Sequence, residues 1–160
     1  MKSLELLWDK FEVDAFMSDR ERFHTVFGSE LFYYQTDVKG LVQTVLRVVK
    51  ERGLFLSTHI FRVEGQEEEF IDSLRNIGAW EAYVVPIDSF VSSTELDSNP
   101  GWFNCRTLVC GNPAVLAEIV SSAGKQTEGW RPYAEVLEEE AIERANQSSA
   151  SSFFMNLSNV

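Results

Sequence analysis

The segment 31–63 constrains the fold of this chain more than any other. It reads as an apolar stretch, LFYYQ, an amphipathic stretch, TDVKGLVQTVLRVVKERG, and a second apolar stretch, LFLSTHIFRV. Apolar residues recur at helical spacing in the middle stretch, and Thr36 or Asp37 can cap the start of that helix. Gly53 stands where a left-handed residue would end it. The segment therefore predicts a strand, a helix and a second, parallel strand, with the helix packed on the sheet.

Further helices and strands are predicted on both sides of this unit. Helical periodicity marks residues 3–17, and residues 20–26 fit a short helical turn. As an alternative, the aromatic-rich segment 23–34 holds an additional strand. Downstream, the patterns predict helices over 67–78, 113–124 and 132–145, strands over 80–86 and 102–110, and a loop over 92–101. This order predicts an α/β protein, with a mixed α+β arrangement as the alternative. The expected sheet is mixed, has about four or five strands and carries the helices packed on it.

The length and composition indicate one domain. A chain of 160 residues with 44% hydrophobic residues can bury a core without disulfides or a structural metal. We expect residues 1–146 to form the single globular domain. The remainder, 147–160, joins a serine-rich link to a short apolar tip, FFMNL, and we expect it to be a flexible C-terminal tail.

The charge of the chain is strongly negative and unevenly placed. The net charge is −11; residues 1–63 hold nine basic and nine acidic side chains, whereas residues 64–160 hold five basic and sixteen acidic ones. A surface this acidic repels phosphate backbones and anionic membranes and attracts basic proteins. Direct nucleic-acid binding and membrane binding are therefore not expected.

Two further patterns bear on the compartment. No run of 18 apolar residues is present, and acidic residues interrupt the hydrophobic ones near the N-terminus, so we expect neither a membrane span nor a signal peptide. Cys105 and Cys110 lie five residues apart in one predicted strand, where their side chains point to opposite faces and cannot readily form a disulfide. Reduced thiols in a cytoplasmic protein are the expected state.

Residues that could carry catalysis are few. His24 and His59 are the only histidines, and neither has an evident partner in the sequence, so a structural or surface role is favoured over catalysis. Two cysteines and two distant histidines do not form a metal-ligand pattern. The turn CGNPAV can present backbone amides to an anion, but it lacks the glycine pattern of a phosphate loop. We expect no catalytic residues, no metal and no cofactor, and hence no enzymatic activity.

The acidic residues themselves are the feature that stands out. A solvated surface explains them in the ordinary case; the sharper hypothesis is a face that docks on a basic cleft, with nearby aromatic side chains as anchors. The residues expected to contact such a partner are Glu67, Glu68, Glu69, Asp72, Trp80, Tyr83, Glu95, Asp97 and Trp102.

In its general character, a small acidic α/β chain without catalytic motifs resembles bacterial immunity proteins that neutralise a cognate toxin. The resemblance is one of type and not of motif. It implies a binding protein that inhibits a basic partner such as a toxin or nuclease. Two alternatives stay open: a small enzyme or ligand-binding domain that uses the strand ends near Thr36 and Gly111, and a structural or adaptor subunit.

Overall fold

The computed structural model of the protein describes residues 8, 10–33, 35–60, 65–99, 101 and 105–157, and their side chains except at residues 10 and 147–157. Its elements, in chain order, are α1 (Lys10–Met17), β1 (Phe23–Ser29), α2 (Val38–Val48), β2 (Val49–Ile60), α3 (Gln66–Gly78), β3 (Glu81–Val85), η1 (Ile87–Ser89), α4 (Ser93–Ser98), β4 (Cys105–Gly111), α5 (Pro113–Ala123), η3 (Gly124–Thr127), β5 (Arg131–Pro132) and α6 (Tyr133–Leu157).

The strands form one mixed five-stranded sheet in the order β1-β2-β4-β3-β5, within a single domain. β1 and β2 are parallel and are connected by α2, so a parallel strand-helix-strand unit is present, but its first strand is β1 and not the predicted stretch at residues 31–35. β4 runs antiparallel to both β2 and β3, and the two-residue β5 adds an antiparallel edge to β3. The predicted α/β class and the number of strands are therefore confirmed.

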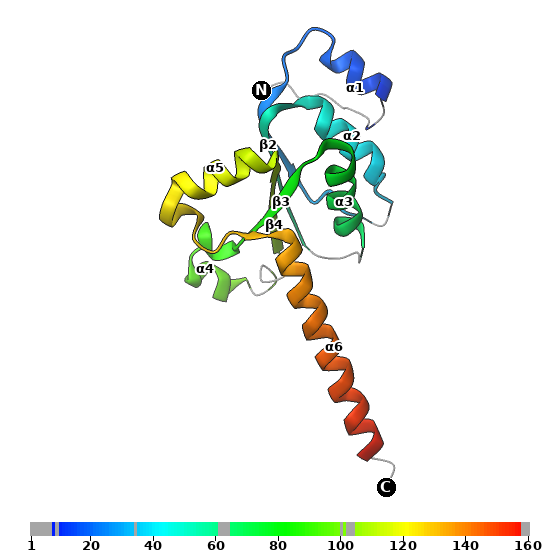
Figure 1. Cartoon of the computed structure of the whole chain (residues 1–160), viewed down its shortest axis with the longest axis vertical. Helices are drawn as coiled ribbons and strands as arrows, with labels where there is room; N and C mark the ends of the chain where they lie inside the picture. The colour runs from blue at the N-terminus through cyan, green and yellow to red at the C-terminus, as the bar shows by residue number, and fades with distance from the viewer. Residues whose placement is uncertain are drawn as a thin grey trace.

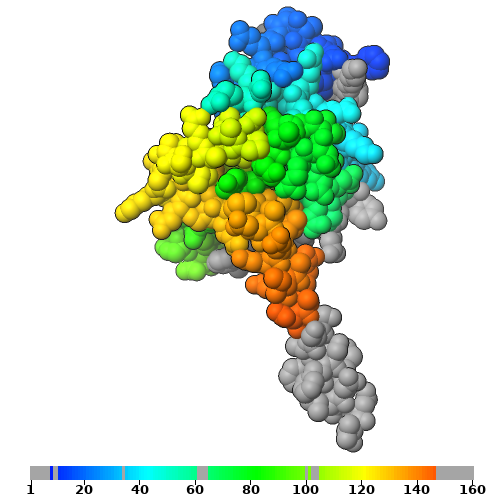
Figure 2. Space-filling view, in the orientation of Figure 1, coloured from blue at the N-terminus to red at the C-terminus, as the bar shows by residue number. Residues whose placement is uncertain are grey.

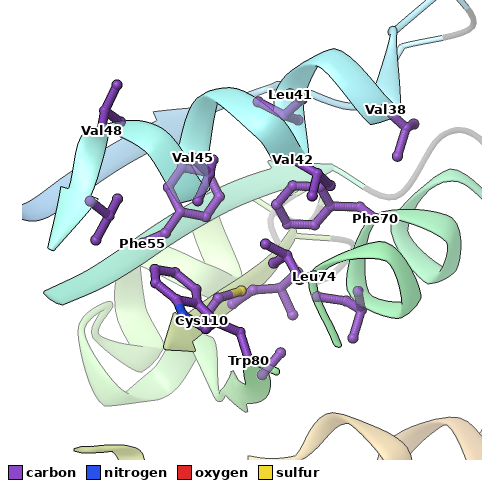
Figure 3. Packing of buried hydrophobic residues seen from close by; sticks show 14 of the residues in the cluster. Val38, Leu41, Val42, Val45, Val48, Phe55, Phe70, Leu74, Trp80 and Cys110 are labelled. Carbon is purple, nitrogen blue, oxygen red and sulfur yellow. The ribbon is translucent and has the colours of Figure 1, made fainter. Parts of the chain in front are cut away.

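Helices cover the two faces of the sheet unequally. α2 and α3 lie on one face, α5 lies on the other, and α6 extends away from the body of the protein (Figure 1). On the first face, α2 contributes Val38, Leu41, Val42, Val45 and Val48 to the main core, which also holds Phe55, Phe70, Leu74, Trp80 and Cys110 (Figure 3). A smaller cluster of Val85, Val109 and Leu116 lies under α5. Burying each such large side chain stabilises the fold by about 1.5–3 kcal/mol.

α2 begins where the sequence predicts, but the strand predicted just before it is not formed. The Asp37 side chain accepts a hydrogen bond from the Gly40 N–H at 3.0 Å and caps the helix. The stretch LFYYQ was expected to be a strand. Instead, the Thr36 hydroxyl donates to the Leu31 carbonyl and accepts from the Tyr33 N–H, and residues 31–33 and 35 lie in a loop. The strand before α2 is β1, which lies in the segment 23–34 where an additional strand was the alternative prediction.

The predicted role of Gly53 is also wrong. α2 already ends at Val48, and Gly53 lies inside β2, which begins at Val49. A Cβ atom at Gly53 would stand 2.8 Å from the His24 carbonyl oxygen of β1. Glycine at this position therefore serves the close approach of two strands and not a helix end.

Two later segments are more helical than expected. Residues 93–98 of the predicted loop form α4, because Ser92 and Glu95 make a capping box in which each side chain bonds the other residue's N–H. The last helix, expected to end near residue 145, continues to Leu157, so the backbone of the expected tail is helical as far as that residue. Within the described part of the chain, no helix has the length and apolar character needed to cross a membrane.

Candidate functional site

Arg106 joins the two most acidic helices of the protein. It lies on β4, where it pairs opposite His59 of β2, and its side chain is 15% exposed. One terminal nitrogen, Nη1, donates to Oε1 of Glu67 at 2.5 Å, and the other, Nη2, donates to Oε1 of Glu140. Glu67 lies in the first turn of α3 and Glu140 lies on α6, so a single guanidinium group holds both helices to the sheet.

His59 binds the other oxygen of Glu67. Its Nε2 atom lies 2.5 Å from Oε2 of Glu67, and both side chains are only 2% exposed. The ring of Phe32 packs edge-on against the imidazole with 4.6 Å between ring centroids. Tyr133, at the start of α6, is also buried beside this group. Four residues are thus joined by hydrogen bonds, and we call them the buried polar network: His59, Glu67, Arg106 and Glu140.

The charges of this network stabilise one another. Burial alone would raise the pKa of Glu67, but the hydrogen bond from His59 and the positive charge of Arg106 hold it below its ordinary value. Burial would likewise lower the pKa of Arg106, and the carboxylates of Glu67 and Glu140 raise it instead. Burial and the nearby Glu67 charge raise the pKa of the Tyr133 hydroxyl, which therefore stays protonated.

The geometry favours a structural role for this network over a catalytic one. A general acid or base must come within hydrogen-bond reach of its substrate, and side chains that are 2% exposed offer almost no surface for that contact. The network instead ties α3, β2, β4 and α6 together. This agrees with the structural role that the sequence favours for His59.

Around the network, the two helices also carry acidic side chains that have no ion pair among the described residues. Glu68 and Glu69 on α3, and Glu138 and Glu143 on α6, form no ion pair with any described residue. α3 and the first turns of α6 lie on the same side of the molecule (Figure 2), and Glu68 is close enough to Tyr133 to raise its pKa. We call α3 and the described side chains of α6 the acidic helix pair.

Other acids on these helices are already engaged. Glu139 makes two hydrogen bonds to Arg131, of 2.6 and 2.7 Å. Asp72 binds Arg75, which also binds Glu81 of β3. The free negative charge of the acidic helix pair is therefore smaller than a count of its carboxylates indicates.

The nine residues predicted to contact a partner differ in exposure and in their place in the structure. Glu67 and Trp80 are 2% and 5% exposed, so the prediction that they lie on a docking surface is wrong. Glu68, Glu69 and Asp72 are at least partly exposed on α3. The remaining residues lie elsewhere: Glu95 and Asp97 are exposed on α4, Tyr83 packs in the cluster under α5, and Trp102 lies outside the described residues.

Sequence reasoning missed Arg106, which organises the site. The signal was present, because Arg106 is a lone basic residue inside an otherwise apolar predicted strand, WFNCRTLVC. A charge in a buried strand almost always has a partner of opposite charge. The sequence does not say which acid supplies it, since Glu67 and Glu140 lie 39 and 34 residues away.

A surface groove of about 520 Å³ lies apart from the buried polar network. It runs between α1, α2 and the end of α3, and its lining residues are Val13, Asp14, Arg22, Gln43, Thr44, Leu46, Arg47 and Ile77. Arg47 donates to Asp14 at 2.7 Å. The groove thus places two guanidinium groups beside apolar side chains.

Metal ligands do not gather in the described part of the chain: no group of three or more His, Cys, Asp or Glu side chains there could hold an ion. The Asn112 turn, considered above for anion binding, uses its own side chain to accept from the Ala114 N–H at 3.0 Å, as a helix cap does. Comparison with known proteins finds no matching family model and no matching curated protein.

Proposed function

We propose that the protein binds a basic protein partner through the acidic helix pair and thereby blocks that partner's function, as an inhibitor of a toxin or nuclease does. The observation that supports this most is the bridge from Glu67 through Arg106 to Glu140, which fixes two acidic helices against one sheet. Their free acids, such as Glu68 and Glu143, are then held in place before a partner arrives.

The chemistry of these side chains suits a positively charged surface. Carboxylates on a fixed scaffold attract Lys and Arg side chains at long range and raise the association rate. The same carboxylates can occupy the positions that phosphate groups take in a nuclease cleft. An interface of this kind needs no cofactor and no reaction on this chain.

The test compares charge reversals of matched size. The double variant Glu68→Lys/Glu69→Lys reverses two negative charges on α3, and Glu138→Lys/Glu143→Lys reverses two on α6. The control, Glu118→Lys/Glu128→Lys, makes the same change in net charge on α5 and on the turn after η3. Glu67 and Glu140 are left unchanged, because reversing either would break the buried polar network.

The measurement starts from a basic protein that co-purifies with the chain at near one-to-one stoichiometry. Its association rate should fall steeply with added salt, while the dissociation rate changes less. One or both helix variants should slow association by about tenfold, and the control should slow it less. If neither helix variant differs from the control, the acidic helix pair is only a solvated surface and the proposal is wrong.

The groove between α1, α2 and α3 supports a second candidate function, the binding of a small organic anion. Arg22 forms no hydrogen bond or ion pair with a described residue. The buried hydroxyl of Thr44 likewise has no hydrogen-bond partner among the described residues. Beside them, Leu46 and Ile77 offer apolar contact. Titration with an aromatic carboxylate, followed by amide NMR, should shift residues of α2 in the native protein but not in Arg22→Gln/Arg47→Gln.

A further inference from the structure

The first strand of the sheet has a free edge. β1 pairs with β2 on one side, and no strand among the described residues pairs with its other side. Its sequence, FHTVFGS, contains no Asp, Glu, Lys or Arg. Both of its phenylalanines are unusually exposed to solvent: Phe23 is 41% exposed and Phe27 is 76% exposed.

The hydrogen bonds to β2 show which backbone groups are free. The Glu30 N–H, just beyond the strand, donates to the Thr58 carbonyl of β2 at 2.9 Å. Successive residues of a strand direct their N–H and C=O groups alternately to the two sides. The even-numbered residues of β1 therefore bond β2, and Thr25, Phe27 and Ser29 direct their backbone groups to the open edge.

Proteins usually protect such an edge. Charged side chains, proline, bulges or a covering loop prevent a second strand from adding to it. Within β1 itself, the sequence offers no Asp, Glu, Lys, Arg or proline, and the one irregularity of register lies at the start, between Phe23 and Thr25. An exposed aromatic residue in the middle, Phe27, adds apolar area that addition of a strand would bury.

We propose that β1 pairs antiparallel with β1 of a second copy of this chain, about a two-fold axis at Val26, so that the two sheets become one. This register places Thr25 of each copy opposite Phe27 of the other and Phe23 opposite Ser29. These residues are all odd-numbered, so the free N–H and C=O groups of one edge meet those of the other. The two Phe27 rings lie diagonally across the axis, within reach of each other.

The distribution of charge favours a second copy as the occupant. The acidic excess lies entirely within residues 64–160, whereas residues 1–63, which include β1, carry equal numbers of acidic and basic side chains. Pairing through β1 joins the neutral parts of the two chains and keeps their acidic helix pairs apart. This inference does not depend on the proposed inhibitor function.

The first test measures the mass of the full-length protein by sedimentation equilibrium over a range of concentrations. The native chain should dimerise. Phe27→Lys places two ammonium groups near the axis and should weaken association by about a hundredfold or more, because like charges at an interface cost several kcal/mol. Phe90→Lys, at a phenylalanine that is 55% exposed and lies after η1, is the matched control and should leave the dimer intact.

Two further variants test the strand pairing itself. Phe27→Pro removes an outward N–H and leaves the hydrogen bonds of the even-numbered residues to β2 unchanged, so it should give a folded monomer with an unchanged circular dichroism spectrum. Val26→Cys should form a disulfide between copies on oxidation, because a two-fold axis at residue 26 brings its two Cα atoms to about 4.5 Å. A cysteine at Glu51, exposed on β2, should not.

A native chain that is monomeric at every concentration overturns the proposal. So does a dimer that survives in both Phe27→Lys and Phe27→Pro, because its interface then lies elsewhere. A monomer whose β1 binds an unrelated extended peptide would also overturn it, since the edge would then serve another protein.

Discussion

His59 on β2 and Glu67 at the start of α3 lie 2.5 Å apart between Nε2 and Oε2, and each side chain is 2% exposed. An ionised carboxylate at this depth is costly unless hydrogen bonds and opposite charge compensate it. His59 binds one carboxylate oxygen of Glu67 and Arg106 binds the other, so both oxygens have a hydrogen-bond partner.

Replacing Glu67 should make the protein less stable, and by more at neutral pH than in acid. Because the pKa of Glu67 is lowered in the folded state, its ionised form stabilises the fold above the ordinary pKa of a glutamate, and that contribution is lost as the pH falls through the folded value. Glu67→Gln leaves Arg106 with one carboxylate, and we expect a loss of about 3 kcal/mol at neutral pH. Urea unfolding at pH 7 and at about pH 3.5 measures the difference.

The control for this variant is Glu69→Gln, which makes the same chemical change at an exposed position of α3. It should change the free energy of unfolding by no more than about 0.5 kcal/mol. Two results would contradict a stabilising, ionised Glu67. One is an equal loss of unfolding free energy in the two variants, and the other is a loss in Glu67→Gln that does not become smaller in acid.

Replacing Arg106 should release α6 from the sheet. Arg106→Leu leaves Glu67 and Glu140 without their shared cation, and breaking such a buried pair costs about 3–5 kcal/mol. Hydrogen exchange of the amides in the first turns of α6 should become faster than in the native protein. Arg131→Leu is the matched control: it also removes a partner of a glutamate on α6, Glu139, but that pair is exposed, and exchange in α6 should change little.

The two cysteines should differ in reactivity. Both are reduced and lie on β4, with Cys105 half-buried and Cys110 fully buried in the main core. Burial, and to a lesser extent the charge of Glu67, raises the pKa of the Cys110 thiol, and the thiolate is the reactive form. A disulfide reagent at neutral pH should therefore modify Cys105 alone in the native protein and both thiols in denaturant. Native labelling that persists in Cys105→Ser would contradict this.

Removing residues 147–160 should leave the fold largely intact. Among the described side chains of α6, Tyr133 and Leu137 in its first turns join the main core, and Glu140 binds Arg106. A chain ending at residue 146 keeps all of these, so its melting temperature should stay within a few degrees of the native value. A chain ending at residue 132 loses them and should melt far lower. A large decrease already at residue 146 would show that the last turns are part of the core.

Local patterns made α2, α3, β3 and α5 predictable. In each, the period of the apolar residues and a capping or turn residue, such as Asp37 or Asn112, agree on the same element. The errors lie where two local signals compete. Residues 31–35 have strand composition, but the Thr36 hydroxyl bonds their backbone, and Ser92 with Glu95 turns a polar loop into a helix. Side-chain to backbone hydrogen bonds of this kind depend on conformation and leave only a weak trace in composition.

The sequence by itself determined the class of the fold, the helix α2 with a strand after it and the acidic character of the second part of the chain, because these depend on periodicity and on the number of charges. Only the tertiary structure decided what each acid does. Glu67 and Glu68 are neighbours in the sequence with the same side chain, yet Glu67 is buried between His59 and Arg106, whereas Glu68 is partly exposed and forms no ion pair with a described residue. A helix turns by about 100° per residue, so adjacent side chains meet different surroundings. What those surroundings are is set by β2, β4 and α6, whose contributing residues lie up to 73 positions from Glu67.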